Sequence, residues 1–321
     1  MSQLNSVVAI GELLVDFVQK SVNEAGYPVL SGYPGGAPCN FLSVIAKYGE
    51  PCQMITQVGD DELGRLLIAT LEDCGIDTSL VQVSPEHFTT LAFVTIDATG
   101  DRRFSFARKY SADLELKYHP VFEQAIAGSR VLHFGSLSLT AEPVLTTTRR
   151  CVEFAAQRGV WLNFDPNYRA DLWSSENKAI EQMRWGISRA NSVKLSEEEF
   201  SLIFGRTAER EHIVEVFSQY ENLYFVLVTR GAEGATAYHR GELIDVAGVK
   251  NIEVVDTTGA GDIFGGSVIW YLLKHTADLR DTDAVILRKA IEFANRVAAL
   301  STTKHGGISS IPNLDLTKDF L

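Results

Sequence analysis

Hydrophobic positions along the chain follow two patterns, and the two patterns alternate. Near-continuous apolar runs, which are typical of strands buried on both faces, occupy residues 7–17, 52–59, 130–139, 160–167, 192–196 and 223–231. Between most of these runs, apolar residues recur at the spacing of an amphipathic helix. Strands that alternate with helices predict βαβ units, and therefore an α/β fold with a mostly parallel sheet flanked by helices.

Several predicted helices have recognisable ends. Helical spacing is found in residues 41–49, 61–75, 262–276 and 283–301. Gly49 suits the C-cap of the first of these helices, and Asp60 is expected to be the N-cap of the second. The tail 306–312 is expected to be a loop because Gly, Ser and Pro dominate it.

Two segments interrupt this rhythm. Residues 91–97 and 102–109 alternate apolar and polar positions around the turn sequence Ala-Thr-Gly-Asp, which predicts a β-hairpin. Residues 18–33, rich in Gly and Pro with short apolar pieces, are also expected to be extended. Together they predict a small β-layer that is separate from the main sheet.

Composition and charge narrow the class of protein. The chain has 321 residues, 45% of them hydrophobic, so a sizeable core can form in one large α/β domain or two small ones. The net charge of −12, without any long run of Lys and Arg, argues against binding to nucleic acid or to an anionic membrane surface. We find no apolar stretch long enough for a transmembrane helix and no charged start of a signal peptide, so a cytoplasmic protein is expected.

Cysteine and histidine spacings point to neither disulfides nor zinc. The four cysteines form no C-x-x-C pair, and the seven histidines form neither H-E-x-x-H nor H-x-x-x-H. A small disulfide scaffold is therefore excluded, and a dedicated zinc site is not expected.

The segment Asp-Thr-Thr-Gly-Ala-Gly-Asp-Ile-Phe-Gly-Gly, residues 256–266, carries the clearest chemical signal. A glycine-rich turn before a helix usually holds an anion, yet Asp262 directly follows its second glycine. One interpretation is a turn that only lets a helix pack closely. A second is a dinucleotide site, since Gly259, Gly261 and Gly265 follow an expected strand at 252–255. That interpretation fails because a second helix follows where a strand ending in an acid is required, and because Asp262 would repel a pyrophosphate.

A third interpretation uses both the glycines and the acid. Backbone N–H groups of Gly259, Ala260 and Gly261, at the positive end of the following helix, form an anion hole for a moving phosphoryl group. Asp262 then faces the attacking alcohol and accepts its proton. This arrangement predicts a kinase for a hydroxyl-bearing substrate. The chain lacks G-x-x-x-x-G-K-[ST] and the signatures of protein kinases, so neither of those classes applies.

Two long motifs resemble one family. Residues 256–272, and Gly-Gly-Ala-Pro-Cys-Asn with the sequence that follows it over 35–67, resemble the C-terminal and N-terminal signatures of the ribokinase-like sugar kinases, the PfkB family. Residues 11–17, 104–116, 164–173 and 228–235 look most like bacterial fructokinases. The similarity covers essentially the whole chain. It implies a single ribokinase-like domain over 1–321, with segments at about 17–34 and 89–110 inserted as a small β-sheet lid.

The resemblance assigns roles around the reacting groups. It implies that Asp262 is the catalytic base and that the turn at Gly259–Gly261 is the anion hole. The residues it places around the sugar are Asp16, Gly35, Gly36, Asn40, Phe104, Arg108, Asn167 and Arg169, with Tyr110 nearby. Asp16 alone could be a turn residue at a strand end, the lid residues could be a solvated hairpin face, and Arg169 could equally be a salt-bridge partner.

Nucleotide and ion contacts follow from the same resemblance. Nucleotide-binding residues are expected at Lys194, Ser196, Thr229, Gly231, Gly234 and Asn295. Glu199 is expected to contact Mg²⁺ through water, although Ser196 stands where the family often has asparagine. A K⁺ ion beside the anion hole is expected to be held by Asp256, Thr258, Gly306 and Ser310; alternatively, Asp256 only caps the turn.

The resulting hypothesis is an ATP- and Mg²⁺-dependent sugar kinase that converts D-fructose to fructose 6-phosphate. Aminoimidazole riboside and 2-keto-3-deoxygluconate stay open as substrates. The second is acidic, and Arg103, Arg108 and Arg169 could bind its carboxylate. A catalytically silent fructokinase-like binding protein is another alternative, but it would be expected to have lost the base or the glycine turn. The resemblance also implies a homodimer that forms through the lid.

Overall fold

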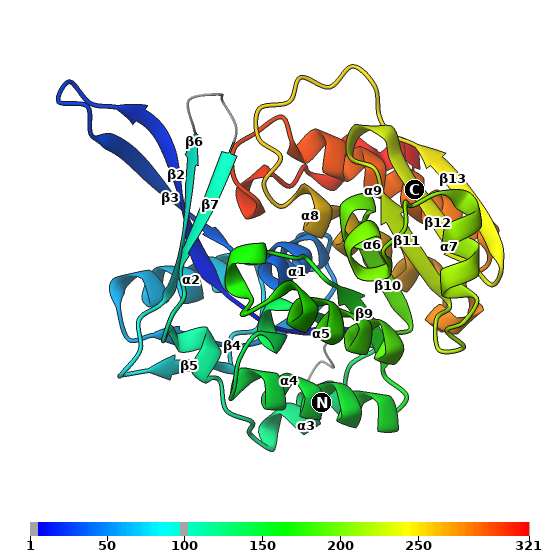
Figure 1. The fold of residues 1–321 in the computed structure, drawn as a ribbon, viewed down its shortest axis with the longest axis horizontal. Coiled ribbons are helices and arrows are strands. Elements are labelled where there is room, and N and C mark those ends of the chain that lie inside the picture. The colour runs from blue at the N-terminus through cyan, green and yellow to red at the C-terminus, as the bar shows by residue number, and fades with distance from the viewer. Residues whose placement is uncertain (1–5, 97–101, 321) are drawn as a thin grey trace.

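A nine-stranded sheet forms the centre of the molecule in the computed structural model, which describes residues 6–96 and 102–320 (Figure 1). In spatial order its strands are β13 (Glu242–Ala247), β12 (Gly234–His239), β11 (Phe225–Thr229), β10 (Ser192–Ser196), β9 (Trp161–Asp165), β8 (Val131–Gly135), β1 (Val7–Ile10), β4 (Cys52–Gly59) and β5 (Val81–Ser84). Neighbouring strands from β5 to β11 are parallel, and β12 and β13 are antiparallel additions at one edge. The predicted α/β class with a mostly parallel sheet is confirmed.

Both faces of this sheet are covered, because successive side chains of a strand point to opposite faces. On β1, Val7 and Ala9 belong to one hydrophobic core, and Val8 and Ile10 belong to the other. The first core packs under α1 (Ala37–Lys47), α2 (Glu62–Asp73), α8 (Ala260–His275) and α9 (Ala284–Ser301). The second packs under α3 (Val121–Ala127), α4 (Val144–Gln157), α5 (Glu176–Arg189), α6 (Glu197–Phe204) and α7 (Arg210–Phe217). This double burial explains the continuous apolar runs in the sequence.

Helix α8 is apolar on nearly all sides because it lies between the sheet, α1 and α9. Its close approach to α1 depends on Gly266, where a Cβ atom would lie 2.6 Å from the carbonyl oxygen of Phe41. Within the described residues, none of the helices is both long and apolar enough to cross a lipid bilayer.

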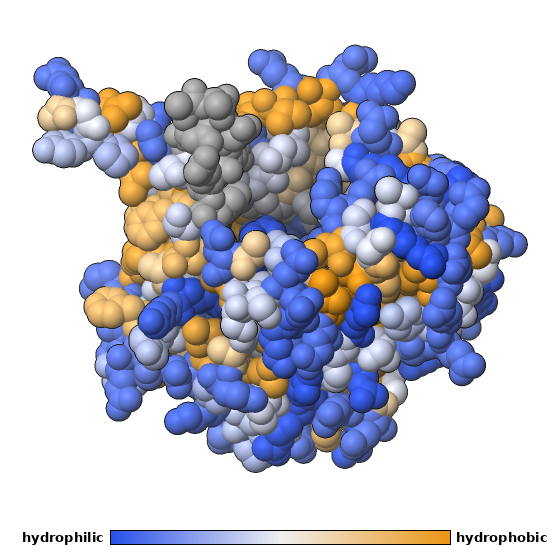
Figure 2. All heavy atoms as spheres, in the orientation of Figure 1, coloured by the Kyte–Doolittle hydropathy of each residue, from blue (hydrophilic) through white to orange (hydrophobic). Residues whose placement is uncertain are grey.

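A second, four-stranded sheet stands beside the main one. Its order is β3 (Pro28–Gly35), β2 (Leu14–Val22), β6 (Thr90–Ile96) and β7 (Arg102–Ala107). β6 and β7 pair in antiparallel register, as the hairpin prediction requires, while the predicted turn at 98–101 lies outside the described residues. The β2–β3 hairpin projects away from the body in Figure 1, and Figure 2 shows apolar residues on it.

Residues 7–17 do not form one strand, so that prediction was wrong. The chain leaves the main sheet after Ile10 and enters the small sheet at Leu14, because β1 pairs with β4 and β8 whereas β2 pairs with β3 and β6. Gly11 lies at this crossing, where a Cβ atom would be 2.6 Å from Cγ of Pro38. An apolar run cannot reveal such a change of sheet, since both parts are equally hydrophobic.

Smaller corrections concern element ends. Asp61, not Asp60, caps α2, and its Oδ1 accepts a hydrogen bond from the N–H of Gly64 at 2.8 Å. The expected strand at 252–255 is irregular chain in which Val254 and Val255 are exposed. The run at 130–139 ends as a strand at Gly135, and a short 3₁₀ turn, Ile308–Ser310, lies inside the predicted tail loop.

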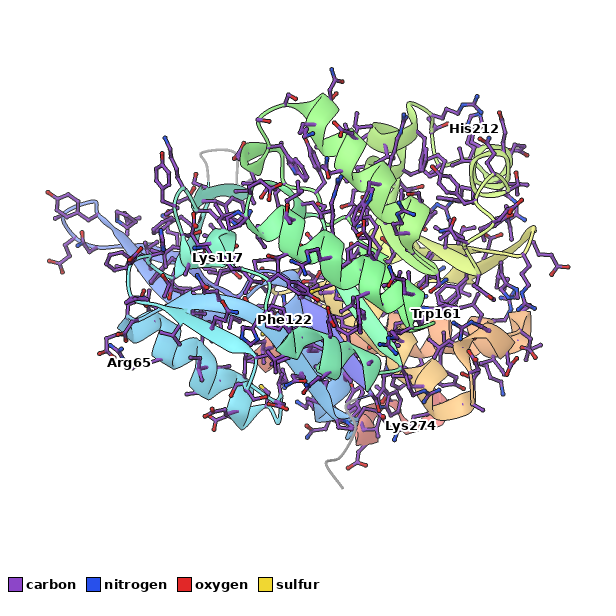
Figure 3. All side chains as sticks on the ribbon, turned by 90° about the horizontal axis from the view of Figure 1, so that it is seen from below. Arg65, Lys117, Phe122, Trp161, His212 and Lys274 are labelled. Carbon is purple, nitrogen blue, oxygen red and sulfur yellow. The ribbon has the colours of Figure 1, made fainter. Side chains whose placement is uncertain are left out.

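Seen from below, the long side chains divide between the interior and the rim (Figure 3). Phe122 and Trp161 are fully buried among the helices and strands, whereas Arg65 and Lys274 project outward. Most charged groups therefore lie at the surface, and the buried ones are held by a cation or by hydrogen bonds.

Candidate active site

A cavity of about 500 Å³ opens at the carboxyl ends of the parallel strands, which is where α/β sheets bind ligands. It is lined by Glu12, Leu14, Asp16, Gly36, Ala37, Asn40, Phe106, Leu137, Asn167, Arg169, Thr257, Thr258, Gly259 and Asp262. These residues come from the small sheet, from the segments that follow β1, β8 and β9, from the start of α1, and from the turn and first residues of α8. Segments far apart in the sequence therefore meet around one space.

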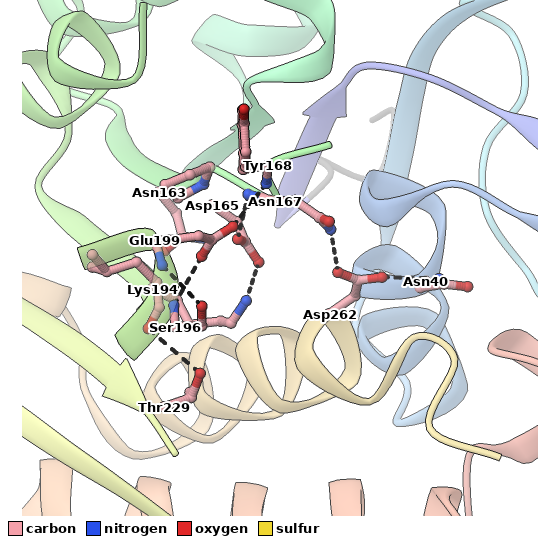
Figure 4. A network of polar contacts seen from close by, with 12 residues as sticks. Asn40, Asn163, Asp165, Asn167, Tyr168, Lys194, Ser196, Glu199, Thr229 and Asp262 are labelled. Atoms are coloured by element: carbon pink, nitrogen blue, oxygen red, sulfur yellow. Dashed lines mark hydrogen bonds and ion pairs between the residues drawn. The ribbon is translucent and has the colours of Figure 1, made fainter. Parts of the chain in front are cut away.

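Asp262 lies in the first turn of α8 between two amide side chains (Figure 4). Its Oδ2 accepts a hydrogen bond from Nδ2 of Asn40 at 2.9 Å, and its Oδ1 accepts one from Nδ2 of Asn167 at 2.8 Å. Burial raises the pKa of Asp262, and the nearby carboxylate of Asp165 raises it further, against the opposing effect of Lys194. A carboxylate with a raised pKa binds a proton more readily, which suits a general base.

The glycine turn begins this helix. Gly259 is its N-cap, with φ of 74°, a left-handed conformation that favours glycine. The amide of Ala260 already donates to the carbonyl of Thr257 at 3.2 Å, while the following amides belong to the helix start, where N–H groups have no acceptor within the helix. At Gly261 a Cβ atom would lie 3.3 Å from Nζ of Lys194, so this cation sits directly beside the turn.

Asp16 also meets Gly35 and Gly36 at the cavity. A Cβ atom on Gly35 would lie 2.1 Å from Oδ2 of Asp16, so only glycine leaves room for this carboxylate. Gly36 has φ of 113°, and a Cβ there would lie 2.5 Å from the carbonyl oxygen of Glu12. Burial raises the pKa of Asp16 to about 7, with Arg169 opposing the shift and Asp262 adding to it.

Glu12 is a cavity residue that sequence reasoning missed. Its side chain is buried, and its Oε1 accepts a hydrogen bond from the N–H of Ala37, the first residue of α1, at 2.9 Å. Burial raises the pKa of Glu12 to about 7. The available signal was a lone carboxylate inside the apolar run 7–17.

Arg108 does not face the sugar side as predicted. Its guanidinium forms a buried salt bridge with Asp113 at 2.7 Å, and further hydrogen bonds to Oγ1 of Thr140 and the carbonyl of Leu137. Tyr110 is 71% exposed and is not among the residues that line the cavity. The side chain of Phe104 lies outside the described residues, and Phe106, two positions later on the same strand, lines the cavity instead.

Arg169 and Asn167 follow β9 and both line the cavity. Nη1 of Arg169 donates to the carbonyl of Tyr168 at 2.8 Å, and its charge lowers the pKa of Asp16 and of Asp262. The positive charge is thus held near two carboxylates.

Of the predicted nucleotide residues, Lys194, Ser196 and Thr229 lie on β10 and β11, next to the cavity rather than in its lining (Figure 4), whereas Asn295 lies on α9. Nζ of Lys194 lies 2.7 Å from Oδ2 of Asp165, and both groups are buried. Oγ1 of Thr229 donates to the carbonyl of Leu195 at 3.4 Å, and Nδ2 of Asn295 to that of Ala247 at 3.1 Å. Gly231 and Gly234, with φ of 51° and 102°, form the turn between β11 and β12.

Ser196 and Glu199 form a capping box at the start of α6. Oε2 of Glu199 accepts from the N–H of Ser196 at 2.8 Å, and Oε1 accepts from the N–H of Tyr168 at 2.7 Å. Each oxygen keeps a second lone pair, so this carboxylate fits a water-mediated contact to Mg²⁺ better than direct coordination. In the described part of the chain, no group of three or more His, Cys, Asp or Glu residues is arranged to hold a metal ion directly.

Asp256 is buried beside the glycine turn that begins α8, and both of its oxygens accept backbone hydrogen bonds. Oδ1 accepts from the N–H of Thr258 at 2.9 Å and Oδ2 from that of Gly306 at 3.1 Å. Oγ of Ser310 donates to the carbonyl of Gly307 at 2.7 Å. These contacts are those of the capping alternative, and they join the turn before α8 to the C-terminal tail.

Comparisons with known proteins agree on one family. The model for "pfkB family carbohydrate kinase" matches residues 4–314. Fructokinase-1 of Zea mays is 37% identical over 308 residues, which cover 95% of this chain and 94% of that protein.

Solved structures agree as well. A fructokinase from Xylella fastidiosa with bound ATP superposes with a TM-score of 0.88 at 26% identity, over 99% of this chain and 98% of that chain. A fructokinase from Vibrio cholerae O395 with bound fructose, ADP and calcium superposes with a TM-score of 0.84 at 29% identity, over 98% of this chain and 99% of that chain. A double mutant of the Vibrio cholerae enzyme with bound fructose, ADP and potassium also has a TM-score of 0.84, at 28% identity over the whole of both chains.

Proposed function

Because the chain belongs to the pfkB family of carbohydrate kinases, we propose that it transfers the γ-phosphoryl group of ATP to the 6-hydroxyl of D-fructose. The observation that carries this proposal is the position of Asp262. It is a buried carboxylate with a raised pKa that borders both a cavity of sugar size and the first amides of α8. The fructose and nucleotide seen in related fructokinases support the choice of substrates.

The proposed reaction uses the two sides of the turn before α8. The sugar hydroxyl loses its proton to Asp262, and its oxygen attacks the γ-phosphorus as the bond to the β-phosphate oxygen breaks. Free amides at the start of α8 stabilise the negative charge on the transferred phosphoryl group, together with Lys194, which lies beside Gly261. Mg²⁺ bound to ATP would neutralise phosphate charge, with Glu199 holding one of its waters.

A neutral sugar fits the charges of the cavity better than an acidic one. Among the side chains that the structure describes, three carboxyl groups, those of Glu12, Asp16 and Asp262, line the space together with one cation, Arg169. Arg108, which could have bound a sugar acid, is held by Asp113. In addition, Oδ1 of Asn40 is buried without a hydrogen-bond partner among the described residues, so a sugar hydroxyl would satisfy it. These features disfavour 2-keto-3-deoxygluconate.

Two finer features belong to the same proposal. K⁺ would bind beside Asp256 and the tail at Gly306–Ser310; a related fructokinase has been solved in a potassium-bound form. Two copies would pair through the small sheet, since Val22, Tyr27, Val29 and Leu30 expose apolar surface on the projecting hairpin. Light scattering of the purified protein tests the dimer, and a cytoplasmic location stays a prediction.

A coupled ADP-release assay over a panel of sugars and nucleosides tests the substrate. D-fructose should give a higher kcat/KM than ribose, adenosine, aminoimidazole riboside and 2-keto-3-deoxygluconate, because a missing hydroxyl leaves buried polar groups unpaired. If 2-keto-3-deoxygluconate gives the highest value, Arg169 binds a carboxylate and the fructokinase proposal is wrong.

A further inference from the structure

Asp165, the last residue of β9, contacts both sides of the reacting end of the cavity without lining the cavity itself. Its Oδ2 accepts a hydrogen bond from Nζ of Lys194 at 2.7 Å, and its Oδ1 accepts one from the N–H of Asn167 at 3.2 Å. The residue is only 4% exposed. A buried carboxylate is costly unless it is paired and hydrogen-bonded, so these contacts explain how it is tolerated there.

One contact fixes the cation. Nζ of Lys194 lies 3.3 Å from the point where a Cβ on Gly261 would be, directly beside the start of α8. Burial alone would favour the neutral amine, but the carboxylates of Asp165 and Glu199 raise the pKa of Lys194 overall. Asp165 thus keeps a charged ammonium group next to the amides that would receive the phosphoryl group.

The other contact fixes an amide that touches the proposed base. Asn167 has φ of 43°, an uncommon backbone conformation that its N–H contact with Asp165 stabilises. In this conformation Nδ2 of Asn167 donates to Oδ1 of Asp262 at 2.8 Å. Ser136 holds the same turn from the other side through the carbonyl of Pro166.

We infer that Asp165 is a positioning residue that fixes the relative positions of Lys194, the cation of the site, and Asp262, the proposed base, on either side of the phosphoryl group to be transferred. It acts on the cation directly and on the base through Asn167. This inference rests on the proposed function, in which Asp262 accepts the proton of the sugar hydroxyl. It adds a residue that contacts neither of the two substrates.

Charges that face Asp262 come from several elements. Asp165 lies on β9, Lys194 on β10, Arg169 in the loop after β9 and Asp16 on β2. Burial is the main reason that the pKa of Asp262 is raised, and the negative charge of Asp165 is the next. Removing that charge should lower the pKa of the base.

The test is the pH dependence of kcat/KM for Asp165→Asn, a change that keeps the shape of the side chain. We expect kcat to fall about tenfold to a hundredfold, the size typical of losing a charge-assisted hydrogen bond. The acidic limb of the profile should move to lower pH. Glu50→Gln is the matched control, because Glu50 forms its ion pair with Lys274, at 2.5 Å, outside the cavity lining. The acidic limb of the Glu50→Gln profile should coincide with that of wild type.

The inference is wrong if Asp165→Asn has the same kcat and the same acidic limb of kcat/KM as wild type. It is also wrong if the acidic limb of Glu50→Gln moves as far as that of Asp165→Asn. If Asp165→Asn does not fold, Asp165→Asn combined with Lys194→Met removes both charges. Its acidic limb should lie below that of Lys194→Met alone, and an equal or higher limb counts against the inference. Asp262→Asn distinguishes a failure of the proposed function from a failure of this inference. If Asp262→Asn keeps its turnover, the proposed function fails. If Asp262→Asn is inactive but the acidic limb of Asp165→Asn does not move, only the role of Asp165 is wrong.

Discussion

Two buried ion pairs of this molecule have similar geometry and very different surroundings. Arg108 and Asp113 approach to 2.7 Å, as do Lys194 and Asp165. The guanidinium of Arg108 also donates to Thr140 and to the carbonyl of Leu137, and Asp113 also accepts from Ser111 and Thr90. The protein itself therefore provides acceptors for most N–H groups of Arg108.

The second pair is not saturated. Within the described residues, Asp165 is the one hydrogen-bond acceptor of Lys194, whose ammonium group has three hydrogens to donate. The unused donors lie beside Gly261, at the end of the cavity. A buried cation with unused donors is costly unless a ligand completes it, so the comparison separates a structural pair from one prepared for an anion.

The largest expected effect concerns the carboxylate that the unsaturated pair faces. Asp262→Asn should keep the fold, since the amide has nearly the same size, but it cannot take the proton of the sugar hydroxyl. Turnover should fall on the order of a hundredfold or more in steady-state assays. Near-wild-type kcat in the purified variant would show that another group is the base, and ATP binding measured by calorimetry controls for an intact site.

Breaking each pair in turn tests the comparison itself. Lys194→Met should lower kcat/KM for ATP by about tenfold to a hundredfold, because a phosphate loses a charge-assisted contact. Arg108→Met should instead cost about 3–5 kcal/mol of unfolding free energy, because it leaves Asp113 buried without its cation. At a temperature where both proteins are folded, the kcat/KM for ATP of Arg108→Met should stay close to wild type. If it falls as far as that of Lys194→Met, saturation does not separate the two roles.

Stability should depend on pH through the buried carboxyl group of Glu12. Its pKa is raised to about 7 in the folded protein, so this group contributes stability at low pH that is lost as the pH rises through 7. Of the stability that wild type loses between pH 5 and pH 8, about 2.5 kcal/mol should come from Glu12, measured by denaturant unfolding of the ligand-free protein.

Glu12→Gln removes this titration while its amide oxygen can still accept from Ala37, so the pH dependence should flatten. Asp16, whose pKa is also raised, should keep part of the slope. Glu62→Gln, on the exposed start of α2, is the control and should leave the slope unchanged. The same slope in Glu12→Gln and wild type would mean that Glu12 stays ionised in the folded protein.

The sequence predicted those parts of the site in which residue type and chemistry coincide. Asp262 was identified from its place after the glycines of the turn, and Asn40 and Asp16 from the resemblance to the family; the structure brings the three residues to one cavity. Arg108 was misplaced, since a cation in a hairpin motif gives no sign of its buried partner five residues later. Asp165 was not assigned a role, because its two contacts are made by a neighbouring strand and by the turn that follows it.

The same limit applied to the fold. Alternating runs predicted the main sheet, but the crossing between β1 and β2 depends on which strands pair, and pairing is a property of the whole chain. Periodicity describes one segment at a time. The predicted single strand at 7–17 failed for this reason.

The smallest expected effect concerns the turn that carries the anion hole, where two interpretations predict different results. If K⁺ binds beside Asp256, kcat should rise a few-fold with K⁺ and much less with Na⁺ at constant ionic strength, because the ion would fix the amides that face the phosphoryl group. Asp256→Ala should then abolish the difference between the two ions. If Asp256 only caps the turn, its loss should cost about 1–3 kcal/mol of stability through the freed amides of Thr258 and Gly306, equally in either salt.

Asp256→Asn sharpens the test, since one amide oxygen can still cap Thr258 but the negative charge is gone. A cation dependence lost in Asp256→Asn, with most of the stability retained, supports K⁺ binding. Equal rates of the wild-type protein in K⁺-free and K⁺-containing buffers would leave Asp256 as the link between the turn and the tail.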